Sequence, residues 1–157
     1  GASLGGLLAL TAATEVAAAA LVLINPMSPL GRPGSALRPD VVPWARQRSL
    51  ASTRRAMPDA DDAARMFAYR RWRDESGAVL NAAQDGMAYQ APACPVLVLA
   101  SADDEDTPAV ASRALAHQLG ADFELIAQAS HVGPLLGRAA ARIAERACDW
   151  LRVRAPV

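Results

Sequence analysis

A serine, an aspartate and a histidine that together could carry out acyl transfer occur in that order along this 157-residue sequence. Ser3 lies in Gly-Ala-Ser-Leu-Gly, a G-x-S-x-G pattern typical of a sharp strand-to-helix turn that exposes a serine hydroxyl. Asp104 and His131 follow it. A hydroxyl nucleophile, a base that takes its proton and an acid that orients the base are the parts needed for covalent acyl transfer. We therefore predict that these three side chains share one site.

Position, rather than residue type, singles out His131 as the base. It lies in Ser-His-Val-Gly, between small residues that leave the imidazole free to turn, and just after a predicted strand at residues 123–127. The other histidine, His117, falls inside a predicted helix and is expected to be a surface residue.

The acid is one member of an acidic run from Asp103 to Asp106 that follows a predicted strand. A calcium loop is the alternative for such a run, but the alternation of oxygen ligands and the central glycine of that loop are missing. Cys94 and Cys148 show no CxxC or Cys/His ligand spacing, so the sequence predicts two buried free thiols, no disulfide and no metal site. No cofactor is predicted either.

The elements that must position these residues alternate between strand and helix. Short apolar runs predict strands buried on both faces, and apolar residues at helical spacing predict helices. Thr107 as N-cap, Pro108 at the first helical position and Gly120 just past the end bracket one of these helices. The predicted order is helix 4–13, strand 17–24, strand 95–100, helix 108–119, strand 123–127 and a closing helix with Ile143, Ala147, Trp150 and Leu151 on its apolar stripe. This order requires parallel strands with flanking helices, an α/β fold.

Residues 27–93 differ in character from the rest of the chain. This stretch carries many prolines and scattered arginines and no strong strand pattern, so we interpret it as a mainly helical cap inserted into a single domain of residues 1–157. Aspartates before residue 63 and arginines up to Arg73 predict a helix at 63–73, because such charges suit the helix dipole.

Composition excludes several classes of partner. Lys+Arg and Asp+Glu both total 16, so there is no net field to attract nucleic acid or an anionic membrane. No apolar stretch reaches the roughly 18 residues that a membrane span needs. With 52% hydrophobic residues a packed core is expected, and a cytoplasmic location is the prediction.

The motifs together resemble those of the α/β-hydrolase superfamily. Residues 1–6 look like its nucleophile elbow, residues 20–26 like the next strand, residues 95–108 like the acid strand and turn, and residues 130–135 like the histidine loop. The order Ser, Asp, His is also that of the superfamily. With Ser101 in a glycine position and Pro108 as anchor, the resemblance assigns the acid to Asp104, while Asp103 and Asp106 stay open as substitutes.

The resemblance implies a fold of which this chain is the C-terminal part, beginning at the elbow. Five strands precede the elbow in the family, and one oxyanion donor comes from that half; the other is the backbone N–H of Leu4. The sequence opens on Gly1 rather than Met, and the predicted strand 17–24 would have a bare edge, so we expect pairing with an N-terminal fragment or a homodimer.

The activity implied is that of a serine esterase acting on a small-molecule ester, lactone or thioester without a cofactor. The cap offers an apolar lining for such a substrate, although each of these side chains could equally belong to the core of the cap: Met66, Phe67, Tyr69, Trp72, Met87 and Tyr89. Two alternatives stay open. One is an acyltransferase or cofactor-free haloperoxidase, and the other is a catalytically silent fragment or interaction module.

Overall fold

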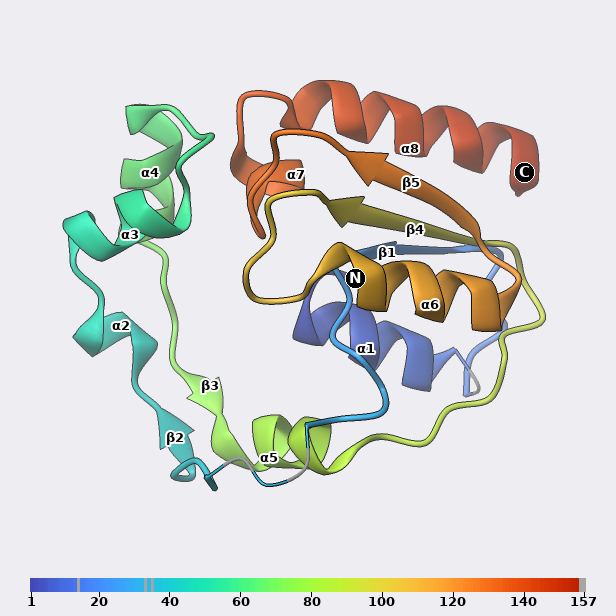
Figure 1. Cartoon of the computed structure of the whole chain (residues 1–157), viewed down its shortest axis with the longest axis horizontal. Coiled ribbons are helices and arrows are strands. Elements are labelled where there is room, and N and C mark those ends of the chain that lie inside the picture. Colours follow the sequence, from blue (N-terminus) through green and yellow to red (C-terminus); the bar gives the residue numbers. More distant parts are fainter. Residues whose placement is uncertain (14, 33, 35, 156–157) are drawn as a thin grey trace.

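A parallel sheet of three strands forms the centre of the chain in a computed structural model that describes residues 1–13, 15–32, 34 and 36–155. The strand order is β1-β4-β5, with β1 at Leu21–Ile24, β4 at Val96–Ser101 and β5 at Asp122–Ile126 (Figure 1). Both neighbouring pairs are parallel, as the sequence predicted. The first strand is shorter than the predicted range 17–24, since it begins only at Leu21.

Both faces of the sheet are covered by helices. Helices α1 (Leu4–Ala12) and α6 (Ala109–Leu119) lie on one face, and α8 (Ala140–Arg154) lies on the other (Figure 1). Successive side chains of a strand point to opposite faces, so Val96 and Val98 of β4 pack in the cluster with α6. Leu97 and Leu99 pack in the cluster that includes Ile143, Ala147 and Trp150 of α8. The predicted apolar run and helix stripe therefore build a core with two layers.

The residues before α1 lie along the outer edge of β1. Ala2 forms a parallel bridge with Ile24, the Ser3 N–H donates to the Ile24 carbonyl at 2.9 Å, and the Ile24 N–H donates to the Gly1 carbonyl at 2.9 Å. The expectation of a bare edge on this strand is therefore wrong at its carboxyl end. Gly1 to Ser3 act as the end of a further parallel strand there.

Most of the regular elements in the segment between β1 and β4 are helices, joined by longer stretches of irregular chain. Its helices are α2 (Trp44–Gln47), α3 (Leu50–Ala56), α4 (Asp62–Tyr69) and α5 (Gly77–Asp85), and a short antiparallel ladder joins β2 (Val41–Val42) to β3 (Glu75–Ser76). Figure 1 shows α2, α3 and α4 beyond the carboxyl ends of the sheet strands. Asp61 caps α4 by accepting a hydrogen bond from the Ala64 N–H at 2.7 Å. This helix ends at Tyr69, earlier than the predicted residue 73.

Residues 27–93, which we call the insert after their predicted role, have an apolar core, and that core reaches the histidine loop. Met57, Ala60 and Ala68 are buried, and they pack against partly buried Ala64 and Trp72 and against the histidine-loop residues Val132 and Leu136. Leu136 belongs to the short helix α7, Gly133–Leu136. Trp72 is thus part of the core of the insert.

Two smaller predictions have opposite outcomes. His117 is exposed on α6, as predicted. Cys94 and Cys148 are free, but the first is half-buried and the second is exposed, so the prediction of two buried thiols is wrong. None of the helices in the described part of the chain is long and apolar enough to cross a bilayer.

Candidate active site

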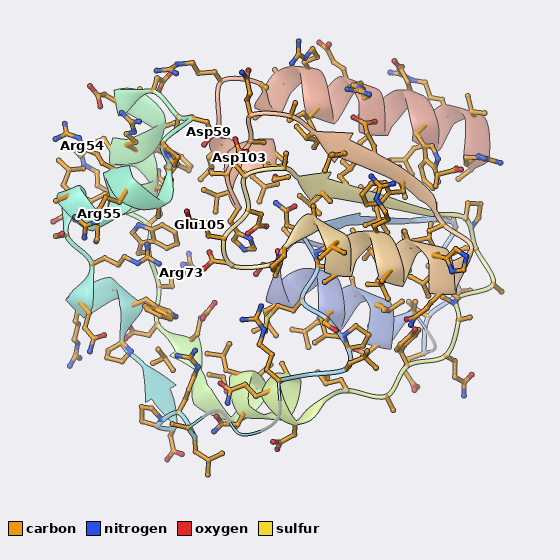
Figure 2. All side chains as sticks on the ribbon, in the orientation of Figure 1. Arg54, Arg55, Asp59, Arg73, Asp103 and Glu105 are labelled. Atoms are coloured by element: carbon orange, nitrogen blue, oxygen red, sulfur yellow. The ribbon has the colours of Figure 1, made fainter. Side chains whose placement is uncertain are left out.

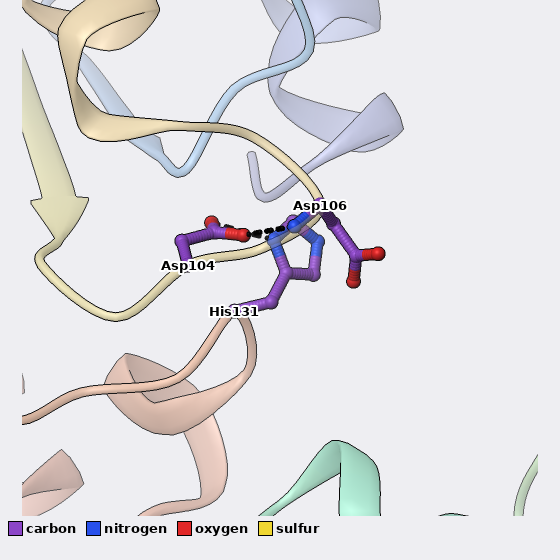
Figure 3. A group of neighbouring side chains, drawn as sticks. All are labelled: Asp104, Asp106 and His131. Carbon is purple, nitrogen blue, oxygen red and sulfur yellow. Dashed lines mark hydrogen bonds and ion pairs between the residues drawn. The ribbon is translucent and has the colours of Figure 1, made fainter.

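Asp104 and His131 face each other at the carboxyl edge of the sheet. Asp104 follows β4, His131 follows β5, and neighbouring parallel strands bring these two loops together. The imidazole Nδ1 lies 2.7 Å from Asp104 Oδ2 (Figure 3). The carboxylate side chain is fully buried, whereas 16% of the histidine side chain is exposed. The structure thus pairs two of the three predicted residues, with the acid inside and the base at the surface.

The loop around Asp104 is shaped to receive its carboxylate. Oδ1 accepts hydrogen bonds from the backbone N–H groups of Asp106 and Thr107, both at 2.8 Å, and Oδ2 accepts one from the Thr107 hydroxyl at 2.6 Å. The Thr107 hydroxyl therefore donates to the carboxylate of Asp104. It does not cap α6, whose N-cap is Pro108 and has no side-chain cap hydrogen bond, so the capping prediction is wrong. Asp103 is exposed.

The electrostatics of the pair favour a charged acid. Burial alone would raise the pKa of Asp104, but the hydrogen bonds from His131 and Thr107 outweigh it and lower that pKa from its ordinary value of 3.8. Burial would likewise lower the pKa of His131, but the hydrogen bond and the negative charge of Asp104 outweigh it and raise that pKa above 6.5. The imidazole is therefore tuned as a stronger base than a free histidine.

These opposite shifts predict how the pair contributes to stability at different pH values. A lowered acid pKa stabilises the fold above pH 3.8, and a raised histidine pKa stabilises it below pH 6.5. We expect the difference in unfolding free energy between wild type and His131→Gln to be largest between these two values and to shrink on either side. Urea unfolding across pH 3 to 9 measures it, and a difference that is flat with pH would contradict the expectation.

Ser3 lies at a strained turn between strand and helix. Its backbone has φ 51° and ψ −124°, a conformation that non-glycine residues rarely adopt outside functional turns. A Cβ at Gly1 would overlap the carbonyl oxygen of Gly5, whereas a Cβ at Gly5 would meet nothing within 4 Å. Packing therefore excludes a side chain at Gly1 but leaves room for one at Gly5. Leu4 is the first residue of α1, so its N–H has no acceptor within that helix.

Asn25 joins the end of β4 to the histidine loop, and sequence reasoning did not identify it. The residue is 1% exposed, and its backbone φ is 44°. Its side-chain Nδ2 donates to the His131 carbonyl at 2.7 Å and to the Ser101 hydroxyl at 2.9 Å, and its Oδ1 accepts from the Ser101 N–H at 2.7 Å. An asparagine directly after a buried strand was the signal available, because a buried amide needs partners.

The same residue indicates where Ser3 lies relative to the histidine. Asn25 follows Ile24, whose carbonyl accepts from the Ser3 N–H, while its own side chain holds the His131 backbone. Ser3 and His131 are thus anchored to adjacent residues. Across the described residues, no hydrogen bond joins the Ser3 hydroxyl to the imidazole. Because Nδ1 faces Asp104, Nε2 is the nitrogen left to accept a proton.

A metal site at this position is disfavoured by the hydrogen bonding. Asp104, Asp106 and His131 each offer one ligand atom, and these atoms lie within 4.8 Å of one another (Figure 3). Both oxygens of Asp104 already accept hydrogen bonds, and the pair with Nδ1 has the direct contact expected of an acid and a base. Figure 3 shows the Asp106 carboxylate turned away from that of Asp104.

Comparison with known proteins gives a family and a fold. A model of the "Alpha/beta hydrolase family" matches residues 1–146. No curated protein gives a significant match. Among solved structures, the methylesterase MES16 from Arabidopsis is similar with a TM-score of 0.71 at 11% identity, covering 96% of this chain and 68% of that one.

Two further solved structures have the same arrangement of elements. A thermophilic esterase from Thermogutta terrifontis gives a TM-score of 0.62 at 22% identity, with 99% of this chain and 64% of that one covered. CarC, a serine hydrolase involved in carbazole degradation, gives 0.68 at 16% identity, with 98% and 62% covered. The chain therefore spans about two thirds of the length of these proteins, and at such identities the likeness shows the fold alone.

Proposed function

Because the chain belongs to the alpha/beta hydrolase family, we propose that it carries the catalytic side chains of a serine hydrolase that cleaves a carboxylic ester, lactone or thioester. The observation that carries the proposal is the 2.7 Å pair of Asp104 and His131, anchored through Asn25 to the strand that pairs with the Ser3 turn. A buried acid, a base with one free nitrogen and a serine on a strained turn are the parts that acyl transfer needs.

The proposed reaction follows from these roles. His131 Nε2 takes the proton of the Ser3 hydroxyl as Oγ attacks the acyl carbonyl, and the Asp104 carboxylate stabilises the imidazolium through Nδ1. The imidazolium then returns the proton to the leaving alcohol or thiol. Water, deprotonated by the same nitrogen, attacks the acyl-Ser3 ester, and the imidazolium returns that proton to Ser3 Oγ as the acyl–oxygen bond breaks and the acid leaves.

The Leu4 N–H is the proposed donor to the oxyanion. It is in the first turn of α1, where the positive end of the helix dipole also favours a developing negative charge. In the family pattern a second donor comes from a loop before the elbow, and loss of one donor typically lowers the rate about 100-fold to 1000-fold. We therefore propose that full activity requires an N-terminal segment, which would extend the sheet beside Ala2, or a second copy of the chain there.

Of the six candidate lining residues, Trp72 belongs to the core of the insert, and a lining role for the other five stays a prediction. Phe67 and Tyr69 are exposed, and Arg71 stacks over the Phe67 ring. Figure 2 shows Arg54 and Arg55 on the outer side of the insert and Arg73 on the side towards Glu105, in the loop that follows β4.

Labelling of the nucleophile tests the proposal. We expect a fluorophosphonate to modify Ser3, and Ser3→Ala to abolish both labelling and hydrolysis of a short-chain chromogenic ester. The measurement uses intact mass and peptide mapping on the longest polypeptide that the reading frame encodes. Ser76→Ala is the control: it removes an exposed hydroxyl that caps α5, and it should keep both labelling and hydrolysis. An unlabelled protein would favour a catalytically silent module, and faster turnover with an added alcohol acceptor would indicate an acyltransferase.

A further inference from the structure

Asp59 of the inserted segment holds the backbone and side chain of the residue before His131. Its Oδ1 accepts a hydrogen bond from the Ser130 hydroxyl at 2.6 Å, and its Oδ2 accepts one from the Ser130 N–H at 3.1 Å. Ser130 is 6% exposed and Asp59 is half-buried, so both bonds are partly shielded from water. The insert therefore contacts the histidine loop through a bidentate carboxylate, 71 positions away in sequence.

The histidine loop is shaped to receive this carboxylate. A Cβ on Gly133 would overlap Asp59 Oδ2, and a Cβ on Gly137 would lie 2.9 Å from the same oxygen. Neither glycine has a positive φ. The carboxylate is the nearest obstacle to a side chain at Gly133, whereas at Gly137 the Gly133 carbonyl oxygen is nearer still, at 2.7 Å. The Arg138 N–H adds a third bond, to the Asp59 carbonyl, at 3.1 Å.

Apolar side chains lie around the hydrogen bonds between Asp59 and Ser130. Met57 and Ala60, on either side of Asp59, are fully buried, and they belong to the cluster that also contains Val132 and Leu136 of the histidine loop. In Figure 2 the Asp59 label lies where the connection between α3 and α4 approaches α7. Hydrogen bonds to a carboxylate in a partly buried place are stronger than those at the surface. The two segments should therefore move as one body.

We propose that Asp59 is a positioning residue for His131, through which the insert fixes the place of the proposed catalytic base. The inference rests on the proposed function for its consequence in catalysis, but not for the contact itself. Ser130 precedes His131, so a loop released from Asp59 would carry the imidazole away from Asp104 and Ser3. A displacement of about 1 Å at a reacting group can lower the rate on the order of 100-fold.

The test removes the carboxylate and follows the histidine loop. Asp59→Ala is expected to speed hydrogen exchange of the Ser130 amide at least tenfold and to lower the pH midpoint of the His131 ring in NMR. His117, exposed on α6, serves as the reference for that titration, since the sequence holds only two histidines. Acylation of Ser3 should fall about 10- to 100-fold with little change in KM.

Three further variants make the result specific. Asp59→Asn keeps the shape and one acceptor and should restore much of the rate. Ser130→Ala removes only the hydroxyl donor, and the double variant with Asp59→Ala should be no slower than Asp59→Ala alone. Asp40→Ala, at an exposed aspartate of the same segment, is the control that should leave all three readouts unchanged.

The outcomes separate this inference from the proposed function. Unchanged Ser130 exchange and an unchanged His131 titration in Asp59→Ala would overturn the positioning role, whatever the activity. If the wild type is not labelled at Ser3, the proposed function fails, while exchange and titration still decide the role of Asp59. Should Asp59→Ala not fold, Ser130→Ala decides: wild-type titration and acylation in that variant would reject the inference.

Discussion

Replacing Asp104 by asparagine is expected to lower the turnover of an acyl substrate about 10⁴-fold while the fold is retained, as in other Ser-His-Asp sites. The amide has the shape of the carboxylate but offers an N–H as well as an oxygen, so it can hold the imidazole in the wrong tautomer. It also removes the negative charge that raises the pKa of His131, 2.7 Å away. Steady-state kinetics on a short-chain ester, with circular dichroism as the check on folding, measure the effect.

The neighbouring aspartates provide matched controls for this prediction. Asp103 and Asp106 flank Asp104 at one and two positions, and both are exposed, so the same change to asparagine there removes the same charge from the same loop. We expect Asp103→Asn to change turnover less than twofold. Asp106→Asn should act weakly, because the Asp106 charge also helps to raise the pKa of His131. A loss in Asp106→Asn much larger than that in Asp104→Asn would assign the acid to Asp106.

The elements that hold the site could be predicted because they depend on local patterns. The run from Val96 to Ala100 is apolar at every position, as a strand covered on both faces requires, and all its residues are buried. Gly120 ends α6 in a left-handed conformation, at the position where the sequence placed the helix end. Such signals lie within a few residues of the element that they define. The core elements and their order were therefore accessible from sequence.

The contacts that orient the site could not be predicted, since each joins segments far apart in the chain. Asn25 reaches Ser101 and His131 across 76 and 106 positions, and Asp59 reaches Ser130 across 71. As single residues these are an asparagine before a proline and one aspartate among several. At Thr107 a local signal was misleading. Its place before Pro108 fits a helix cap, but its hydroxyl donates to the buried carboxylate of Asp104 instead. A charge that needs donors outweighs a helix end that water can satisfy.

Replacing Asn25 by alanine is expected to be the most destabilising single change at this site, lowering the free energy of unfolding by about 3 kcal/mol or more. The change leaves the buried Ser101 N–H and the His131 carbonyl without their side-chain partners. It also places alanine at φ 44°, where a residue other than glycine or asparagine is strained by roughly 1 kcal/mol or more. Urea unfolding of the two proteins measures the difference.

Glycine at the same position separates the hydrogen bonds from the backbone. Asn25→Gly loses the same side-chain bonds but adopts φ 44° without strain, so it should be more stable than Asn25→Ala by about 1 kcal/mol and still well below wild type. Gln128 is the control, since it has φ 54° and an exposed side chain, and Gln128→Gly should change stability by less than about 1 kcal/mol. If Asn25→Gly is as stable as wild type, the amide does not hold the histidine loop. Ser3 and His131 would then be joined only through the sheet, and the anchoring on which the proposed site depends would be lost.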